Sequence, residues 1–134
     1  MLFGVDVLKV QEIIQFQEMT VVPLSDTVVR GLVNLRGQIV TALDLHVRLD
    51  IDSNEDTDTR PINIVLCTEG GAVSLLVDSI GDVLTVEETA EESPPPNLNA
   101  KTREILVKVC KLEDELLLVL DAEKTVELGQ LAKL

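Results

Sequence analysis

The apolar residues of this chain come in short runs rich in valine, isoleucine and leucine, and residues that favour turns separate these runs. Such runs are typical of β-strands, because branched side chains pack well on a pleated surface. Three pairs of runs predict hairpins, whose turns fall at residues 36–37, 68–71 and 113–115. The chain is therefore predicted to be mainly β. The predicted strands cover residues 32–35, 38–43, 63–67, 72–77, 105–110 and 116–120.

Helical signals are weaker than the strand signals. Asp26 is placed to cap a turn through residues 27–30, and the apolar spacing of residues 122–134 predicts a terminal helix. Two acidic segments, residues 50–58 and 87–96, are predicted to be solvated loops, and the second runs into three prolines. Short, closely spaced strands with few helices favour small barrels or a sandwich.

The length and the charge of the chain exclude several classes of protein. Its 134 residues are enough for one folding unit, so a single domain is predicted over residues 1–134. The 24 Asp and Glu against 11 Lys and Arg give a formal net charge of -13, which repels phosphate backbones and anionic lipid. The aromatic residues are Phe3 and Phe16, too few for a platform on which bases stack. Nucleic-acid and membrane-surface roles are therefore excluded.

Location and cofactor use are predicted from what the sequence lacks. It contains no secretory leader pattern and no apolar stretch of about 18 residues, which predicts a cytoplasmic protein. Cys67 and Cys110 each lie inside an apolar run and are predicted to be buried thiols. Together with His46 they are too few ligands for a tetrahedral zinc site, so no metal or cofactor is expected.

An enzymatic role would depend on His46, the one imidazole in the chain. Asp44 and His46 lie two residues apart and would share a face if both were on a strand. No serine stands in a Gly-x-Ser-x-Gly motif, however, and an orienting carboxylate normally reaches its histidine across the fold. A surface histidine is the favoured interpretation. A small hydrolase using His46 remains an alternative, to be tested by the His46→Ala substitution.

Residues 29–40, with the sequence VRGLVNLRGQIV, continue to Asp44-Leu45 and resemble the hallmark stretch of the CheW family, the coupling proteins of bacterial chemotaxis. Three other segments follow the family pattern in the expected order, at residues 3–13, 76–84 and 117–124. Together the four motifs span most of the chain.

The resemblance implies a fold of two small SH3-like β-barrel lobes packed together. It implies no catalysis. CheW proteins bridge the cytoplasmic tips of methyl-accepting chemoreceptors to the regulatory domain of the histidine kinase CheA. The implied mechanism is scaffolding, in which an apolar groove between the lobes takes a receptor helix and a barrel end docks the kinase.

Six residues match positions of the family motifs. The resemblance implies that Val10 and Glu12 lie on the strand facing the receptor groove, and that Val77 is the contribution of the second lobe. Val10 and Val77 would equally serve as core aliphatics in another β protein. Arg36 matches the arginine of Asn-Leu-Arg-Gly, and it is predicted to pair with Glu12 across neighbouring strands. The other two, Asn34 and Gly37, are assigned to the turn itself.

The sequence also departs from the family pattern. Thr41, His46 and Lys108 stand where proline, arginine and glycine are common, and the family strand that precedes residues 1–3 is missing. A missing strand would leave an unpaired edge, which predicts self-association. Three alternatives stay open: a fragment or relative of the CheA regulatory domain, a relative of CheV, and a degenerate, truncated paralogue.

Overall fold

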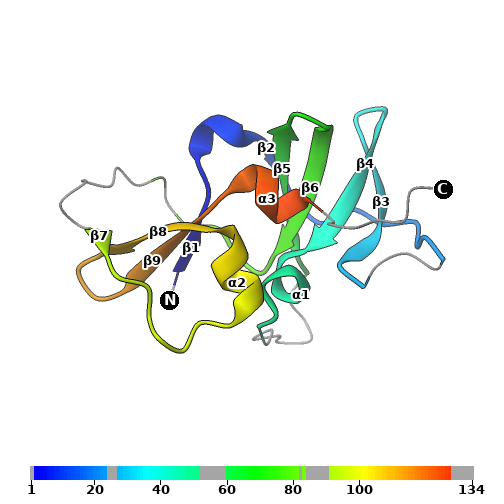
Figure 1. Ribbon diagram of the computed structural model, residues 1–134. Coiled ribbons are helices and arrows are strands. Elements are labelled where there is room, and N and C mark those ends of the chain that lie inside the picture. Colours follow the sequence, from blue (N-terminus) through cyan, green and yellow to red (C-terminus); the bar gives the residue numbers. More distant parts are fainter. Residues whose placement is uncertain (1, 24–26, 52–59, 82, 84–90, 128–134) are drawn as a thin grey trace.

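The structure, a computed structural model, describes residues 2–23, 27–51, 60–81, 83 and 91–127. The strands form two sheets, and three short helices lie where the sheets meet (Figure 1). The first sheet has five strands in the order β2-β5-β6-β4-β3. Their bounds are β2 Val10–Ile14, β5 Ile62–Thr68, β6 Gly71–Val77, β4 Gln38–Asp44 and β3 Val29–Leu35.

The second sheet has four strands and brings the two ends of the chain together. Its order is β1-β9-β8-β7, and β1 runs parallel to β9. After β1, the short 3-10 helix η1 (Val7–Lys9) carries the chain into the five-stranded sheet. The strand bounds are β1 Leu2–Gly4, β9 Leu116–Leu120, β8 Leu106–Lys111 and β7 Glu91–Glu92.

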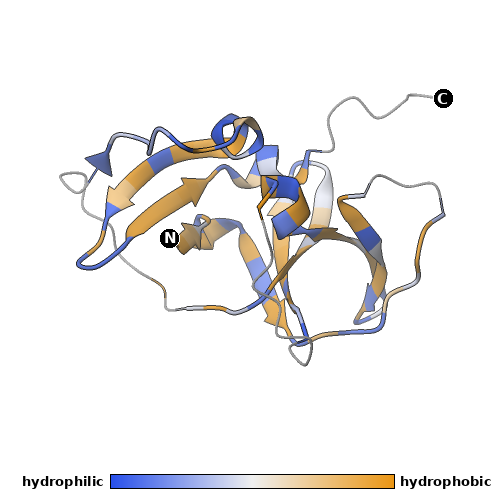
Figure 2. Ribbon diagram, turned by 90° about the horizontal axis from the view of Figure 1, so that it is seen from below, coloured by the Kyte–Doolittle hydropathy of each residue, from blue (hydrophilic) through white to orange (hydrophobic). Residues whose placement is uncertain are grey.

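The five-stranded sheet curls around on itself (Figure 2). A cluster of buried aliphatic side chains fills the space that it encloses. Leu32 of β3 exchanges two backbone hydrogen bonds with Thr20, at 2.8 and 2.9 Å, so the segment after β2 pairs with the outer edge of β3. Gly31 makes this approach possible, because a Cβ there would lie 2.6 Å from the carbonyl oxygen of Thr20. The buried apolar residues of this interior are Val33, Leu35, Val40, Ala42, Val65 and Leu76.

Three helices of five or six residues join the two sheets. They are α1 (Leu45–Leu49), α2 (Ala100–Ile105) and α3 (Ala122–Val126). Asp44, Asn99 and Asp121 cap their N-termini through side-chain oxygens, which satisfies backbone donors that a short helix leaves unpaired.

The helices also hold one another through side chain to backbone bonds. The Asn99 amide donates to the carbonyl oxygens of Leu49 and Asp50, both at 2.9 Å, at the end of α1. The Arg48 guanidinium donates to the carbonyl oxygens of Lys124 and Thr125 at the end of α3. The terminal carbonyls of two helices are thereby satisfied by side chains from a neighbouring helix.

Two apolar clusters fill the space around these helices. In the first, which we call the inter-sheet cluster, Ala122 of α3 packs against Leu66 and Leu75 on the outer face of the five-stranded sheet. In the second, Leu49, Ile105 and Leu120 are fully buried. The two sheets are therefore connected by shared apolar cores as well as by the chain.

The three predicted hairpins are confirmed as β3–β4, β5–β6 and β8–β9. The predicted helix from residue 122 is present but ends at Val126, because Glu127 has an extended backbone. The prediction that residues 91–92 lie in a loop is wrong, because they form β7 and pair with Val109 and Cys110.

The structure also differs from the sequence analysis in two helices and in one of the two cysteines. Helices α1 and α2 were not predicted, and Ile105 ends α2 instead of beginning a strand. Cys110 is buried as predicted, whereas Cys67 is exposed. Asp26, residues 52–59, 84–90 and 128–134 lie outside the described residues. None of the helices in the described ranges is long and apolar enough to cross a bilayer.

Candidate functional site

The β3–β4 turn has a backbone conformation that arginine rarely adopts. Leu35 pairs with Gln38, and the two residues between them have positive φ, 55° at Arg36 and 86° at Gly37. Two positive φ angles are typical of the tightest hairpin turns, in which asparagine and glycine are favoured. Asn34 supports the turn, because its Oδ1 accepts a 3.0 Å hydrogen bond from the Gly37 N–H. Gly37 thus lies in the turn itself, whereas Asn34 lies near the end of β3 and supports the turn through its side chain.

Arg36 reaches from this turn to Glu12 on β2. Its Nη1 lies 3.3 Å from Glu12 Oε2, and the Arg36 side chain is 81% exposed while that of Glu12 is 22% exposed. The predicted ion pair is therefore present. Its predicted placement on neighbouring strands is wrong, because β2 and β3 are the two outermost strands of the five-stranded sheet. The pair spans the gap between these two strands, which we call the seam.

A β-bulge separates Val10 from Glu12. Val10 pairs with Leu66 and Glu12 with Val65, so β2 advances two residues where β5 advances one. Paired residues lie on the same face of a sheet, and Leu66 belongs to the inter-sheet cluster whereas Val65 lies in the barrel interior. Val10 and Glu12 therefore point to opposite faces, although simple alternation would place them on the same one.

Val10 and Val77 lie in the same sheet, but they pair with residues near opposite ends of β5. Half-buried Val10 packs against the inter-sheet cluster and pairs with Leu66 near one end of β5. Val77 pairs with Ile62 at the other end of β5. The expectation that Val77 comes from the second lobe is wrong, and the structure does not bring the two valines together.

Exposed aliphatic side chains lie before β2 and along it. Leu8 on η1 is 86% exposed, and Ile13 on β2 is 54% exposed and pairs with Ile64, so it shares a face with Val10. The sequence analysis missed both residues. Asp6 was a signal for the turn that exposes Leu8, because its Oδ1 accepts the Leu8 N–H at 2.9 Å. Nothing in the sequence marks the bulge that turns Ile13 outward.

His46 lies between two carboxylates. Its Nε2 is 3.0 Å from Asp78 Oδ2 and its Nδ1 is 3.8 Å from Asp44 Oδ1. Asp44 caps α1 and also accepts a 2.7 Å bond from Arg30 Nη1, so Asp44 and His46 do not share a strand face. This arrangement joins α1 to the end of β6 and presents carboxylates, rather than a nucleophilic hydroxyl, to the ring.

Two surface depressions lie elsewhere. One of about 300 Å³ is lined by Glu91, Glu92 and Val107 among others, and one of about 600 Å³ includes Phe16, over whose ring Arg60 stacks at 5.5 Å. Neither depression is lined by His46. Within the described parts of the chain, no three His, Cys, Asp or Glu residues converge to hold a metal ion. The chemistry available at the Arg36 turn and at the start of β2 is that of a protein contact surface.

Comparison with known proteins gives the family. The model of the CheW-like domain matches residues 1–130. The chemotaxis protein CheW of Bacillus subtilis is 31% identical over 93% of this chain and 80% of that protein, and that of Klebsiella aerogenes is 33% identical over 97% and 78%.

The fold comparison agrees. The scaffolding protein TtCheW of Thermoanaerobacter tengcongensis superposes with a TM-score of 0.81 at 23% identity, over 95% of this chain and 81% of that one. The predicted mainly β fold of two SH3-like lobes is thereby confirmed. Because the family model matches nearly the whole chain, and its relatives match in both sequence and fold, the chain belongs to the CheW family.

Proposed function

We propose that this chain is a non-catalytic adaptor that couples methyl-accepting chemoreceptors to the histidine kinase CheA in the cytoplasm, acting as a single CheW-like module. Membership of the family supports a scaffolding role in chemotaxis. The observation that carries the proposal is the Arg36 turn, where a charged side chain is 81% exposed on a backbone conformation that favours asparagine or glycine. Strain of this kind is retained most often at functional sites.

The receptor contact is assigned to β2 and to the exposed helix η1 that precedes it. An amphipathic receptor helix would bury its apolar face against aliphatic side chains that are already presented to solvent. Val10 and Ile13 lie on one face of β2, and Leu8 precedes them on η1. Val77 is assigned to a separate part of the contact surface, because it pairs at the far end of β5.

Glu12 and Arg36 are assigned to the assembly of the complex with the kinase. The exposed guanidinium offers five donors in a fixed geometry, which suits carboxylates on a partner. Glu12 is mostly buried and holds the guanidinium from one side, so it limits the directions in which Arg36 can reach. The ion pair orients Arg36 more than it stabilises the fold.

The test is reconstitution from purified components. The chain is mixed with a receptor cytoplasmic fragment and the CheA regulatory domain from the same genome, and complexes are measured by analytical ultracentrifugation. We expect a ternary complex with wild-type chain and its loss with Arg36→Ala. A folded wild-type chain that fails to bind the receptor fragment, the CheA domain or both would overturn the proposal. Circular dichroism of each variant separates lost binding from lost folding.

A further inference from the structure

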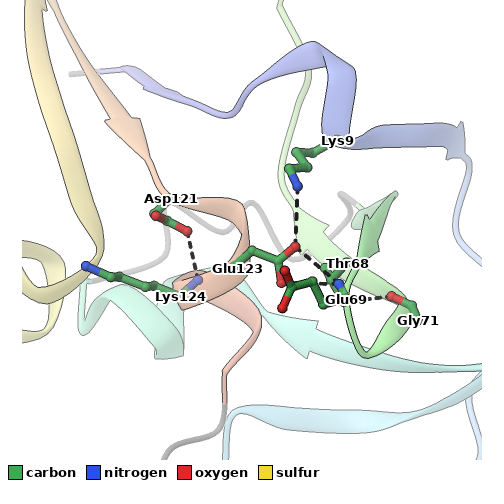
Figure 3. A network of polar contacts seen from close by, with 7 residues as sticks. All are labelled: Lys9, Thr68, Glu69, Gly71, Asp121, Glu123 and Lys124. Atoms are coloured by element: carbon green, nitrogen blue, oxygen red, sulfur yellow. Dashed lines mark hydrogen bonds and ion pairs between the residues drawn. The ribbon is translucent and has the colours of Figure 1, made fainter.

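One carboxylate connects three segments that are far apart in the sequence. Glu123 Oε1 lies 3.4 Å from the Lys9 ammonium and accepts a 3.2 Å hydrogen bond from the backbone N–H of Glu69. The other oxygen, Oε2, lies 3.4 Å from the same N–H. Figure 3 shows Lys9 and the Glu69 turn reaching Glu123 from different directions. We call these three residues the Glu123 clasp.

The clasp lies where the chain passes between the two sheets. Lys9 ends η1, the link from β1 of the four-stranded sheet to β2 of the five-stranded sheet. Glu123 is on α3, which directly follows β9, and Glu69 is in the β5–β6 turn. The carboxylate therefore ties the crossing segment and a turn of one sheet to the helix that extends from the other.

Two local bonds fix the geometry of the clasp. Asp121 Oδ1 accepts the Lys124 N–H at 3.0 Å, which sets the first turn of α3 and with it the direction of Glu123. Thr68 Oγ1 donates to the Gly71 carbonyl oxygen at 2.7 Å across the β5–β6 turn, which holds the Glu69 amide in place (Figure 3). The acceptor and one of its donors are thus held in position before they meet.

The segment just before β2 has few other anchors. Helix η1 contains no buried residue, and Val7 and Leu8 are exposed. The bulge between Val10 and Glu12 interrupts the regular ladder to β5 immediately afterwards. Because Lys9 is the last residue of this exposed helix and precedes the bulge, its link to Glu123 fixes the chain just before Val10.

We infer that Glu123 is a positioning residue for the receptor-facing start of β2, acting through Lys9 and through the Glu69 turn. This inference rests on the proposed receptor contact of Val10 and Ile13. Both partners are partly exposed, so the ion pair adds little to stability. The ion pair instead sets the position of Val10. The apolar face of a receptor helix must contact Val10 in that position.

Three variants separate the contributions to the clasp, and a fourth is their control. Glu123→Gln keeps an oxygen for the Glu69 N–H but loses the charge that attracts Lys9, and Glu123→Ala loses both contacts. Lys9→Met loses only the ammonium. Glu127→Gln is the matched control, because it removes the same charge from an exposed residue just beyond the same helix.

Each variant is measured for affinity toward the receptor fragment and, separately, toward the CheA regulatory domain. We expect Glu123→Ala to weaken receptor binding roughly fivefold to tenfold, with smaller and equal losses for Glu123→Gln and Lys9→Met. The double variant of Lys9→Met with Glu123→Gln should be no weaker than either single one. Kinase affinity and Glu127→Gln should match wild type. Equal receptor affinity in Glu123→Ala and Glu127→Gln would overturn the inference.

Amide hydrogen exchange keeps this test separate from that of the proposed function. The Val10 N–H donates to the Val7 carbonyl oxygen and the Glu69 N–H donates to Glu123, so both amides should exchange faster in Glu123→Ala than in Glu127→Gln. If wild-type chain fails to bind the receptor, the proposed function is wrong, and the exchange at Val10 still decides whether Glu123 positions β2. Unchanged exchange at Val10 contradicts the inference. If Glu123→Ala does not fold, Lys9→Met and Glu123→Gln carry the same comparison.

Discussion

The guanidinium of Arg36 meets the carboxylate of Glu12 at 3.3 Å across the seam between the two outermost strands of the five-stranded sheet. Because the Arg36 side chain is 81% exposed, solvent screens the pair, which contributes about 0–1 kcal/mol to stability. We therefore expect Arg36→Ala to change the free energy of unfolding little, while the ternary complex with receptor and kinase is lost. Urea unfolding and ultracentrifugation measure the two effects on the same protein.

A charge reversal tests whether the two residues act together. Glu12→Arg and Arg36→Glu should each weaken the ternary complex, and the double variant should recover part of the loss because it restores an opposite pair. If the losses of the single variants simply add in the double variant, the residues are not coupled. A charge reversal at Arg30 cannot serve as the control, because the Arg30 guanidinium donates to Asp44, which caps α1.

Two glycines, Gly31 within β3 and Gly37 in the turn that follows it, should respond differently to alanine. At Gly37 a Cβ meets nothing within 4 Å, so Gly37→Ala should cost only the strain of positive φ, about 1 kcal/mol. At Gly31 a Cβ would lie 2.6 Å from the Thr20 carbonyl oxygen, so Gly31→Ala should cost about 2–3 kcal/mol. Thermal and urea unfolding of both variants give the comparison, and equal costs would contradict it.

The bulge in β2 predicts which aspartate substitution removes receptor binding without damage to the fold. Ile13 is 54% exposed, so Ile13→Asp should leave the unfolding midpoint almost unchanged and abolish receptor binding. Val10→Asp should impair both, because Val10 packs against the inter-sheet cluster. Gln11→Asp, at the exposed bulge residue, is the matched control for the added charge. Normal receptor binding by Ile13→Asp would show that this face is not the contact.

Val77→Asp tests the second part of the assigned surface. Val77 is half-buried at the end of β6, and a carboxylate there should weaken receptor binding if this end of β5 contributes to the contact. Ser79→Asp adds the same charge at an exposed position two residues later and should leave binding unchanged. Equal binding by both variants would remove Val77 from the site, whatever the result at Ile13.

Self-association through a strand edge stays a prediction with a specific place in the fold. Among the described strands, β1 pairs with β9 on one side only, and Leu2–Gly4 carries no charge. The opposite edge of the same sheet, β7, consists of two glutamates, which disfavour pairing with another chain. We expect light scattering to detect dimers of the full chain and Leu2→Lys to abolish them. A monomer at all concentrations and in high salt, where the net charge is screened, would contradict this prediction.

The hairpins were predictable because their signals are local. A two-residue turn with Gly37 and an asparagine at position 34 is recognisable from the sequence alone, since left-handed backbone and a side-chain acceptor are properties of those residues. The pairing of Glu12 with Arg36 was predicted from motifs in the family pattern, but its place across the seam was not. Closing a sheet brings its outermost strands together, and no pattern within either strand contains that information.

By itself, the sequence determined the six strands of the three hairpins, their turns and the family, because aliphatic runs and turn-forming residues act over a few positions. Tertiary structure decided the parallel pairings β1–β9 and β4–β6, which join segments distant in the chain. It also decided the bulge that turns Ile13 outward, and the helix that begins after Asp44, which the sequence analysis did not predict. In each case burial against a distant segment, such as α3 on the outer face of β5, outweighs the preference of a short stretch of chain.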